Sequence, residues 1–138
     1  MRTPARNSLT PFTYFVDRNL GKKIVPGILR AAGVRVEVHD DHFAQNATDE
    51  YWLRQVGTKG WIVLNKDHRI RYRLAELKAL KEANVRAFVL TPRNLTAEQN
   101  GEVLKRALPS MTKFIEKNPP PFIAAVTRAA KIVILEGV

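Results

Sequence analysis

Carboxylates in the first half of the chain are the side chains best suited by type and spacing to do chemistry. The candidates are Asp17, Asp40, Asp41, Asp49, Glu50 and Asp67. Crowded carboxylates repel one another, so they stay together only where a cation or hydrogen bonds offset that cost. Carboxylate oxygens suit Mg²⁺ or Mn²⁺, and a divalent ion held by carboxylates can promote the hydrolysis of phosphodiester bonds.

The order of apolar segments predicts how these acids come together. Short β-prone runs alternate with helical periodicity over residues 13–90, which predicts an α/β fold with a mainly parallel central sheet flanked by helices. We expect strands at 14–16, 34–38, 61–64 and 85–90. Ligands of such sheets bind beyond the carboxyl ends of the strands, where Asp17, Asp40, Asp41 and Asp67 would lie. Asp49 follows Thr48, a good N-cap, at the start of a helix facing the same edge.

Glycine and proline residues predict where helices end. The helix that begins after Thr48 should stop at Gly57 or Gly60. A capping box at 96–99 opens a later helix. Pro109 falls inside the pattern of that helix and should kink or end it near Leu108.

The length of 138 residues predicts one domain. We expect a flexible lead-in at 1–12 and a single domain at 13–138. Within that domain, the core occupies 13–90, and a C-terminal helix and hairpin occupy 95–138. The hairpin strands are predicted at 122–126 and 131–135.

The composition excludes several kinds of site and favours one class of partner. The absence of cysteine excludes disulfides, zinc–thiolate sites and thiol catalysis. No apolar run approaches the roughly 18 residues that a membrane span needs, and none resembles a signal peptide, so we predict a cytoplasmic protein without membrane contact. The net charge of +10 and the pI of about 10.3 favour a nucleic-acid partner, although small basic proteins also bind nucleic acid through charge alone.

Positive charge is concentrated after the last aspartate. Residues 69–138 carry 13 basic and 6 acidic side chains, against 10 and 7 in residues 1–68. We predict that Lys66, Arg69 and Arg71 contact phosphates, although plain solvation explains the two arginines equally well.

Several candidates also have a purely structural explanation. Asp49 and Glu50 suit a helix N-terminus, and the pair at 40–41 suits an exposed turn. Asp17 and Asp67 lack such an explanation, because an acid that closely follows a buried strand has few structural uses. We expect solvated histidines in loops and tryptophans in the core: His39, His42 and His68, and Trp52 and Trp61.

Three segments resemble the PIN-like domains, in particular the short group related to VapC-type toxins. These are FVDRNL at 15–20, TDEYWL at 48–53 and VLNKD at 63–67. The resemblance covers about residues 13–90 and implies a three-layer PIN-like fold. It also implies a Mg²⁺- or Mn²⁺-dependent ribonuclease that pairs with a small antitoxin protein. The acids that would hold the metal and carry out catalysis are Asp17, Asp49 (or the neighbouring Glu50) and Asp67.

The chain departs from the PIN-like pattern at two positions. Asn65 stands where the family often has Thr or Ser, and Arg69 stands where a further acid often follows the third. Asp41 or Asp40 is the candidate to replace that fourth acid as a metal ligand.

These observations support competing hypotheses. The first is a metal-dependent endoribonuclease, the toxin of a toxin–antitoxin pair. The alternative is a catalytically decayed PIN-like nucleic-acid-binding module, with Arg69 as the sign of decay. A third, a signalling module that uses the acids for Mg²⁺ alone, is disfavoured by the positive charge. We further predict that the segment 95–111 or the terminal hairpin contacts an antitoxin or, in a homodimer, a second copy of the chain.

Overall fold

The computed structural model describes residues 11–66 and 73–137 of the chain. Residues 1–10, most of the predicted lead-in, lie outside this part of the chain. The candidate site residues Asp67, Arg69 and Arg71 and the predicted loop histidine His68 also lie outside it.

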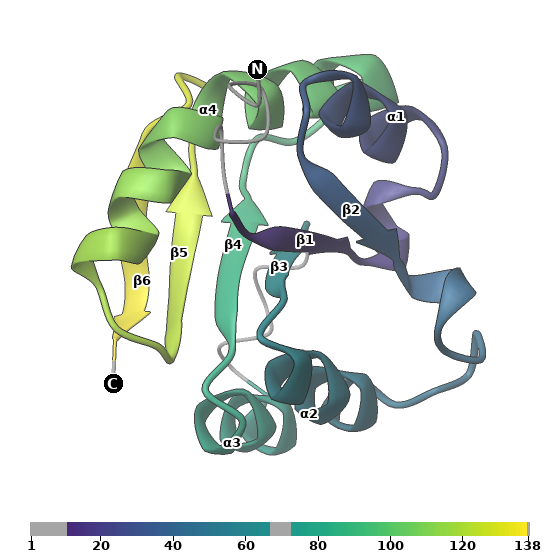
Figure 1. Ribbon diagram of the computed structural model, residues 1–138, viewed down its shortest axis with the longest axis vertical. Coiled ribbons are helices and arrows are strands. Elements are labelled where there is room, and N and C mark those ends of the chain that lie inside the picture. The colour runs from purple at the N-terminus through teal and green to yellow at the C-terminus, as the bar shows by residue number, and fades with distance from the viewer. Residues whose placement is uncertain (1–10, 67–72, 138) are drawn as a thin grey trace, which may run out of the picture.

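A six-stranded sheet forms the centre of the described structure (Figure 1). Its strands are β1 (Thr13–Val16), β2 (Arg35–Val38), β3 (Ile62–Asn65), β4 (Arg86–Leu90), β5 (Phe122–Val126) and β6 (Ile132–Gly137). The strand order is β2-β1-β3-β4-β5-β6, and neighbours among the first five strands pair in parallel. β6 pairs antiparallel with β5. The predicted mainly parallel sheet and C-terminal hairpin are therefore confirmed.

Helices cover both faces of the sheet and make three layers. They are α1 (Ile24–Ala31), α2 (Asp49–Lys59), α3 (Leu74–Glu82) and α4 (Ala97–Lys117). Figure 1 shows α1 and α4 on one face and α2 and α3 on the other. Short 3-10 helices, Arg18–Leu20 and His39–Asp41, follow β1 and β2. Within the described ranges, no helix combines the length and apolarity that crossing a membrane requires.

Alternating strand residues divide the core between the two faces. Tyr14 and Val16 of β1 pack in the cluster under α1 and α4, whereas Phe15 packs with Trp52 in the cluster under α2 and α3. Phe15 is fully buried and Trp52 is only 1% exposed. Residues at the end of β1 are therefore held from both sides, which fixes the direction of the chain as it leaves the sheet.

Of the two glycines predicted as possible ends of α2, Gly60 ends the helix and Gly57 does not. Gly60 is the C-cap, in the left-handed conformation with φ of 71°, as glycine allows. Gly57 lies within the helix, where a Cβ would be 2.5 Å from the carbonyl oxygen of Ala83 and 2.6 Å from its Cβ. Glycine at position 57 therefore permits the close approach of α2 to the end of α3.

Of the two outcomes predicted for Pro109, a kink or an end near Leu108, the end is wrong, because α4 continues through Pro109 to Lys117. An interior proline costs about 3 kcal/mol of helix stability. Burying a large aliphatic or Met side chain contributes about 1.5–3 kcal/mol, and both Met111 and Ile115 are buried beyond the proline. Packing of this apolar stripe on the sheet offsets the missing hydrogen bond, while Pro109 itself faces solvent.

Candidate active site

A pocket of about 340 Å³ opens at the carboxyl edge of the sheet. It is lined by Asp17, Arg18, Asn19, His39, Gln45, Ala47 and Asp49. The pocket lies where β1 and β2 end and α2 begins. In this strand order the chain reverses its direction across the sheet at β1 and β3, which is where open α/β sheets bind ligands. Two candidate acids far apart in the sequence therefore line one pocket.

Asp17 is the most enclosed of the described acids, at 9% exposed. Its backbone N–H donates to the carbonyl oxygen of Leu64 at 3.0 Å, which extends the pairing of β1 with β3 by one residue. One carboxylate oxygen accepts from the backbone N–H of Arg18 at 2.7 Å. The other accepts from the side-chain amide of Asn65 at 2.8 Å. Backbone and side-chain donors thus fix the carboxylate at the end of β1.

Asn65 belongs to the site, although the sequence marked it only as a departure from the family pattern. It is 3% exposed and accepts a hydrogen bond from the Asn19 amide at 3.3 Å. The Asn19 side-chain oxygen accepts in turn from the backbone N–H of Lys66 at 3.1 Å. This network orients the amide that donates to Asp17. An amide that ends a wholly buried strand is the sequence signal that could have revealed this role.

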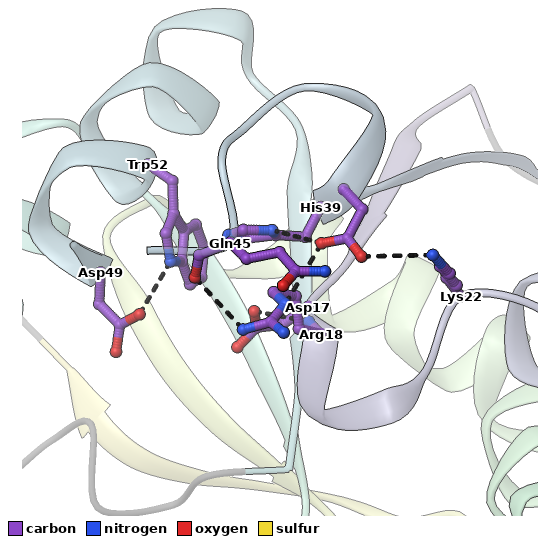
Figure 2. A network of polar contacts seen from close by, with 8 residues as sticks. Asp17, Arg18, Lys22, His39, Gln45, Asp49 and Trp52 are labelled. Carbon is purple, nitrogen blue, oxygen red and sulfur yellow. Dashed lines mark hydrogen bonds and ion pairs between the residues drawn. The ribbon is translucent and has the colours of Figure 1, made fainter. Parts of the chain in front are cut away.

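Asp49 is placed by the start of α2. Thr48 caps the helix as predicted, its hydroxyl accepting from the Tyr51 N–H at 3.2 Å. One oxygen of Asp49 accepts from the indole N–H of Trp52 at 2.9 Å, a contact drawn in Figure 2. The other lies 3.6 Å from Arg73. Trp52 is in the core as predicted, and its indole N–H also orients the Asp49 carboxylate.

His39 is buried, so the prediction that it is solvated is wrong. It is 3% exposed, and its ring centroid lies 5.5–6.2 Å from those of Phe15, Phe43 and Trp52. The 3-10 helix after β2 turns the imidazole toward this aromatic cluster. Nδ1 lies 3.2 Å from a carboxylate oxygen of Asp40.

His42 also has specific contacts. Its Nε2 lies 2.6 Å from a carboxylate oxygen of Glu37, and its ring packs edge-on against Trp61 with centroids 5.0 Å apart. Trp61 is half-buried against the α2–α3 core. Although His42 is exposed, its contacts with Glu37 and Trp61 give it a structural role.

The acids at 40 and 41 have different environments. Asp40 lies 3.2 Å from Arg18 and 3.6 Å from Lys22. The hydrogen bond with His39 holds the pKa of Asp40 below its ordinary value despite partial burial, and the charges of Arg18 and Lys22 add to this. Asp41 is exposed and is not among the residues that line the pocket.

The donor set of the pocket suits a hard divalent ion. Asp17 and Asp49 both line the pocket, and carboxylate oxygens are the ligands that Mg²⁺ and Mn²⁺ prefer. Within residues 11–66 and 73–137, no three His, Asp or Glu side chains converge. The third predicted ligand, Asp67, is outside these ranges. Glu50 is exposed and does not line the pocket.

Of the predicted phosphate-binding residues, the structure describes Lys66. Its ammonium group donates to the carbonyl oxygen of Pro92 at 3.3 Å. This leaves two of its three protons for other acceptors. Arg69 and Arg71 lie outside the described residues, so their contact with phosphate stays a prediction.

Comparison with known families identifies the domain. The sequence pattern of a family described as "PIN like domain" matches residues 12–92. The chain belongs to the PIN-like domain family. The match spans Asp17, Asn65 and Asp49, so the PIN-like part contains the whole pocket and the amide behind it. It ends before α4 and the hairpin.

Similarity of this PIN-like chain to a curated relative reaches beyond residues 12–92. It is a protein of Mycobacterium tuberculosis (strain ATCC 25618 / H37Rv) named "Putative ribonuclease VapC45". The two are 34% identical over 130 residues, which cover 89% of this chain and 92% of the relative. No solved structure matches the chain. The resemblance to the VapC-type PIN-like group is therefore confirmed over most of the sequence.

Proposed function

We propose that this PIN-like protein is a metal-dependent endoribonuclease that hydrolyses phosphodiester bonds of RNA. The observation that carries the proposal is the convergence of Asp17 and Asp49 in one pocket at the β1–β3 position of the sheet. The relative named as a ribonuclease and the net charge of +10 support RNA as the substrate.

In this proposal the two described acids hold Mg²⁺ or Mn²⁺ together with Asp67, while Glu50 and Asp41 are further candidate ligands. A bound divalent ion lowers the pKa of its water and stabilises the leaving oxygen. Asn65 and the backbone N–H of Arg18 fix the direction of the Asp17 carboxylate. Both are in place before any substrate arrives, so little reorganisation is needed during the reaction.

The decisive experiment is cleavage of a panel of single-stranded RNAs by protein freed of any partner. We expect cleavage with Mn²⁺ or Mg²⁺, none in EDTA, and a loss of at least about a hundredfold for Asp17→Asn. Glu116→Gln, which changes an exposed acid on α4, is the matched control and should cleave normally. If the protein binds these RNAs but leaves them intact with both ions, the catalytically decayed binding module is the better description.

We also propose that the protein is the toxin of a toxin–antitoxin pair, as the name of its relative suggests. A second pocket of about 340 Å³ lies between the start of α4 and the hairpin turn. It is lined by Leu95, Glu98, Gln99, Glu102, Val103, Arg106 and Arg128. Its apolar floor and mixed charges suit a small protein partner or a second copy.

Purification from the native operon tests the partner. A co-purifying small protein, or a dimer by size-exclusion chromatography, would support an interface on α4 or the hairpin. A monomer without a partner would contradict it.

A further inference from the structure

A second hollow adjoins the acidic pocket on the side of β2. Its volume is about 290 Å³, and its lining residues are Val16, Arg18, Gly21, Lys22, His39, Asp40 and Gln45. Arg18, His39 and Gln45 also line the acidic pocket. The two hollows therefore adjoin across these shared residues, and we name them together the site groove. Figure 2 shows Arg18 between Asp49 on one side and Lys22 on the other.

The two halves of the site groove differ in charge. The first half carries the carboxylates of Asp17 and Asp49. The second half carries the Lys22 cation and the Asp40 carboxylate, and the Arg18 cation lines both halves. An acidic end thus lies beside an end with excess positive charge. A negatively charged ligand without bound metal would be attracted to the second half and repelled from the first.

Asp40 anchors both cations without using all their donors. Its two oxygens lie 3.2 Å from Arg18 and 3.6 Å from Lys22, and Arg18 also donates to the backbone carbonyl oxygen of Gln45 at 3.3 Å. The Arg18 and Lys22 side chains remain 45% and 59% exposed, against 20% for Asp40. A guanidinium has five N–H donors and an ammonium has three, so donors remain for a ligand in the groove.

Stability alone is a weak explanation for this arrangement. Ion pairs between exposed side chains contribute little to folding. An arginine and a lysine held by a shared acid, with donors left over, match the chemistry of a phosphate. Arginine forms paired hydrogen bonds to phosphate oxygens, and lysine adds a point charge.

We propose that Arg18 and Lys22 form a subsite for a phosphodiester of single-stranded RNA, next to the bond held at Asp17 and Asp49. This subsite rests on the proposed ribonuclease function. Arg18 directly follows Asp17 and its backbone N–H donates to that carboxylate, so the subsite and the acid have a fixed spacing. The subsite sets which part of the RNA backbone reaches the acidic end.

Binding of a fluorescently labelled single-stranded RNA, followed by anisotropy in EDTA, tests the subsite separately from cleavage. Lys22→Gln should weaken binding about three- to tenfold and lower the slope of log K against log salt by about 0.7, the effect of losing one phosphate contact. Lys23→Gln is the matched control. It removes another exposed cation one position along the chain that does not line the site groove, so affinity and slope should stay at the wild-type values.

Arg18→Gln should weaken binding at least as much as Lys22→Gln, and thermal melts of each variant exclude unfolding as the cause. Equal affinities for Lys22→Gln and Lys23→Gln, or a wild type that does not bind RNA, would overturn the subsite. The two proposals fail separately. Cleavage with a wild-type KM in Lys22→Gln removes the subsite alone, whereas Lys22-dependent binding without cleavage in any metal removes the ribonuclease alone.

Discussion

At the scale of single residues, neutral donors help to orient the two acids that line the pocket, and the cation Arg73 also lies near Asp49. Asp17 accepts from a buried amide and Asp49 accepts from a buried indole. Each neutral donor restricts the rotation of the carboxylate without adding a charge beside it. Such partners of metal ligands commonly affect metal affinity or activity by ten- to a hundredfold. The neutral donors are therefore the sharpest tests of the site.

Replacing Trp52 by Phe tests the donor to Asp49. The substitution keeps an aromatic ring in the core and removes the N–H bonded at 2.9 Å. Because the acid is partly exposed, we expect a loss of only about 1 kcal/mol in stability, together with a weaker thermal shift on adding Mn²⁺. Trp61→Phe is the control, since Trp61 packs on the same core without contacting Asp49. Equal Mn²⁺ shifts in the two variants would rule out a role for the indole.

Replacing Asn65 by Ala tests the donor to Asp17. The carboxylate loses the partner at 2.8 Å inside a buried site, so we expect a loss of about 1–3 kcal/mol in stability and a ten- to hundredfold fall in cleavage. Asn100→Ala serves as control, because Asn100 is also buried but lies on α4. Urea unfolding and single-turnover cleavage separate the two effects. Normal cleavage by Asn65→Ala would show that Asp17 needs no amide partner.

At the scale of elements, local signals predicted most of the fold. Thr48 and Thr96 begin helices because their hydroxyls accept from the backbone, as their positions indicated. The position of Asp17 after β1 was predicted because a short, β-prone apolar run ends at that residue. The continuation of α4 past Pro109 depends on packing against the sheet, which no local pattern contains.

The site was predicted less completely than the fold, because several of its contacts depend on packing that no local pattern contains. The acids follow strand ends or begin a helix, so sequence order was enough to propose that they converge. The burial of His39 depends on Phe15 of β1 and Trp52 of α2 as well as on the nearby Phe43. The pairing of Asp40 with Arg18 and Lys22 depends on how β1 and β2 lie side by side. Contacts between distant segments of this kind have no periodic signature.

The contact between α2 and α3 yields a prediction at this scale. Gly57→Ala should destabilise the protein by about 1–3 kcal/mol, despite the better helix propensity of alanine, since the new Cβ would be 2.5 Å from the Ala83 carbonyl oxygen. Gly27→Ala is a matched control in α1, where nothing lies within 4 Å of the added Cβ. That variant should be more stable by up to about 1 kcal/mol. Urea unfolding measures both, and a stabilised Gly57→Ala would contradict the close packing.

At the scale of the whole molecule, charge is unevenly arranged for a protein with a net charge of +10. Asp17 and Asp49 lie together in one pocket, while cations line the adjoining hollow. A ligand that binds only the folded protein stabilises it in proportion to the logarithm of its excess over Kd. Divalent ions should therefore act on global stability as well as on chemistry.

Mn²⁺ should raise the melting temperature of the wild type at neutral pH. At a hundredfold excess over Kd the stabilisation is about 2.7 kcal/mol, which corresponds to a shift of several degrees. Asp17→Asn changes a proposed metal ligand and should respond much less, whereas Glu116→Gln should respond like the wild type. Thermal melts in EDTA and in millimolar Mn²⁺ measure the difference. Identical shifts in wild type and Asp17→Asn would show that Asp17 is not part of the ion site.

The hydrogen bond between Trp52 and Asp49 has an optical consequence. The chain has two tryptophans, and the indole of Trp52 touches a carboxylate that lines the pocket. Its emission should respond when the charge on that carboxylate is neutralised or its hydrogen bond is altered. In a Trp61→Phe background, Trp52 is the sole indole fluorophore, so the occupancy of the pocket could be followed in real time without attaching a dye.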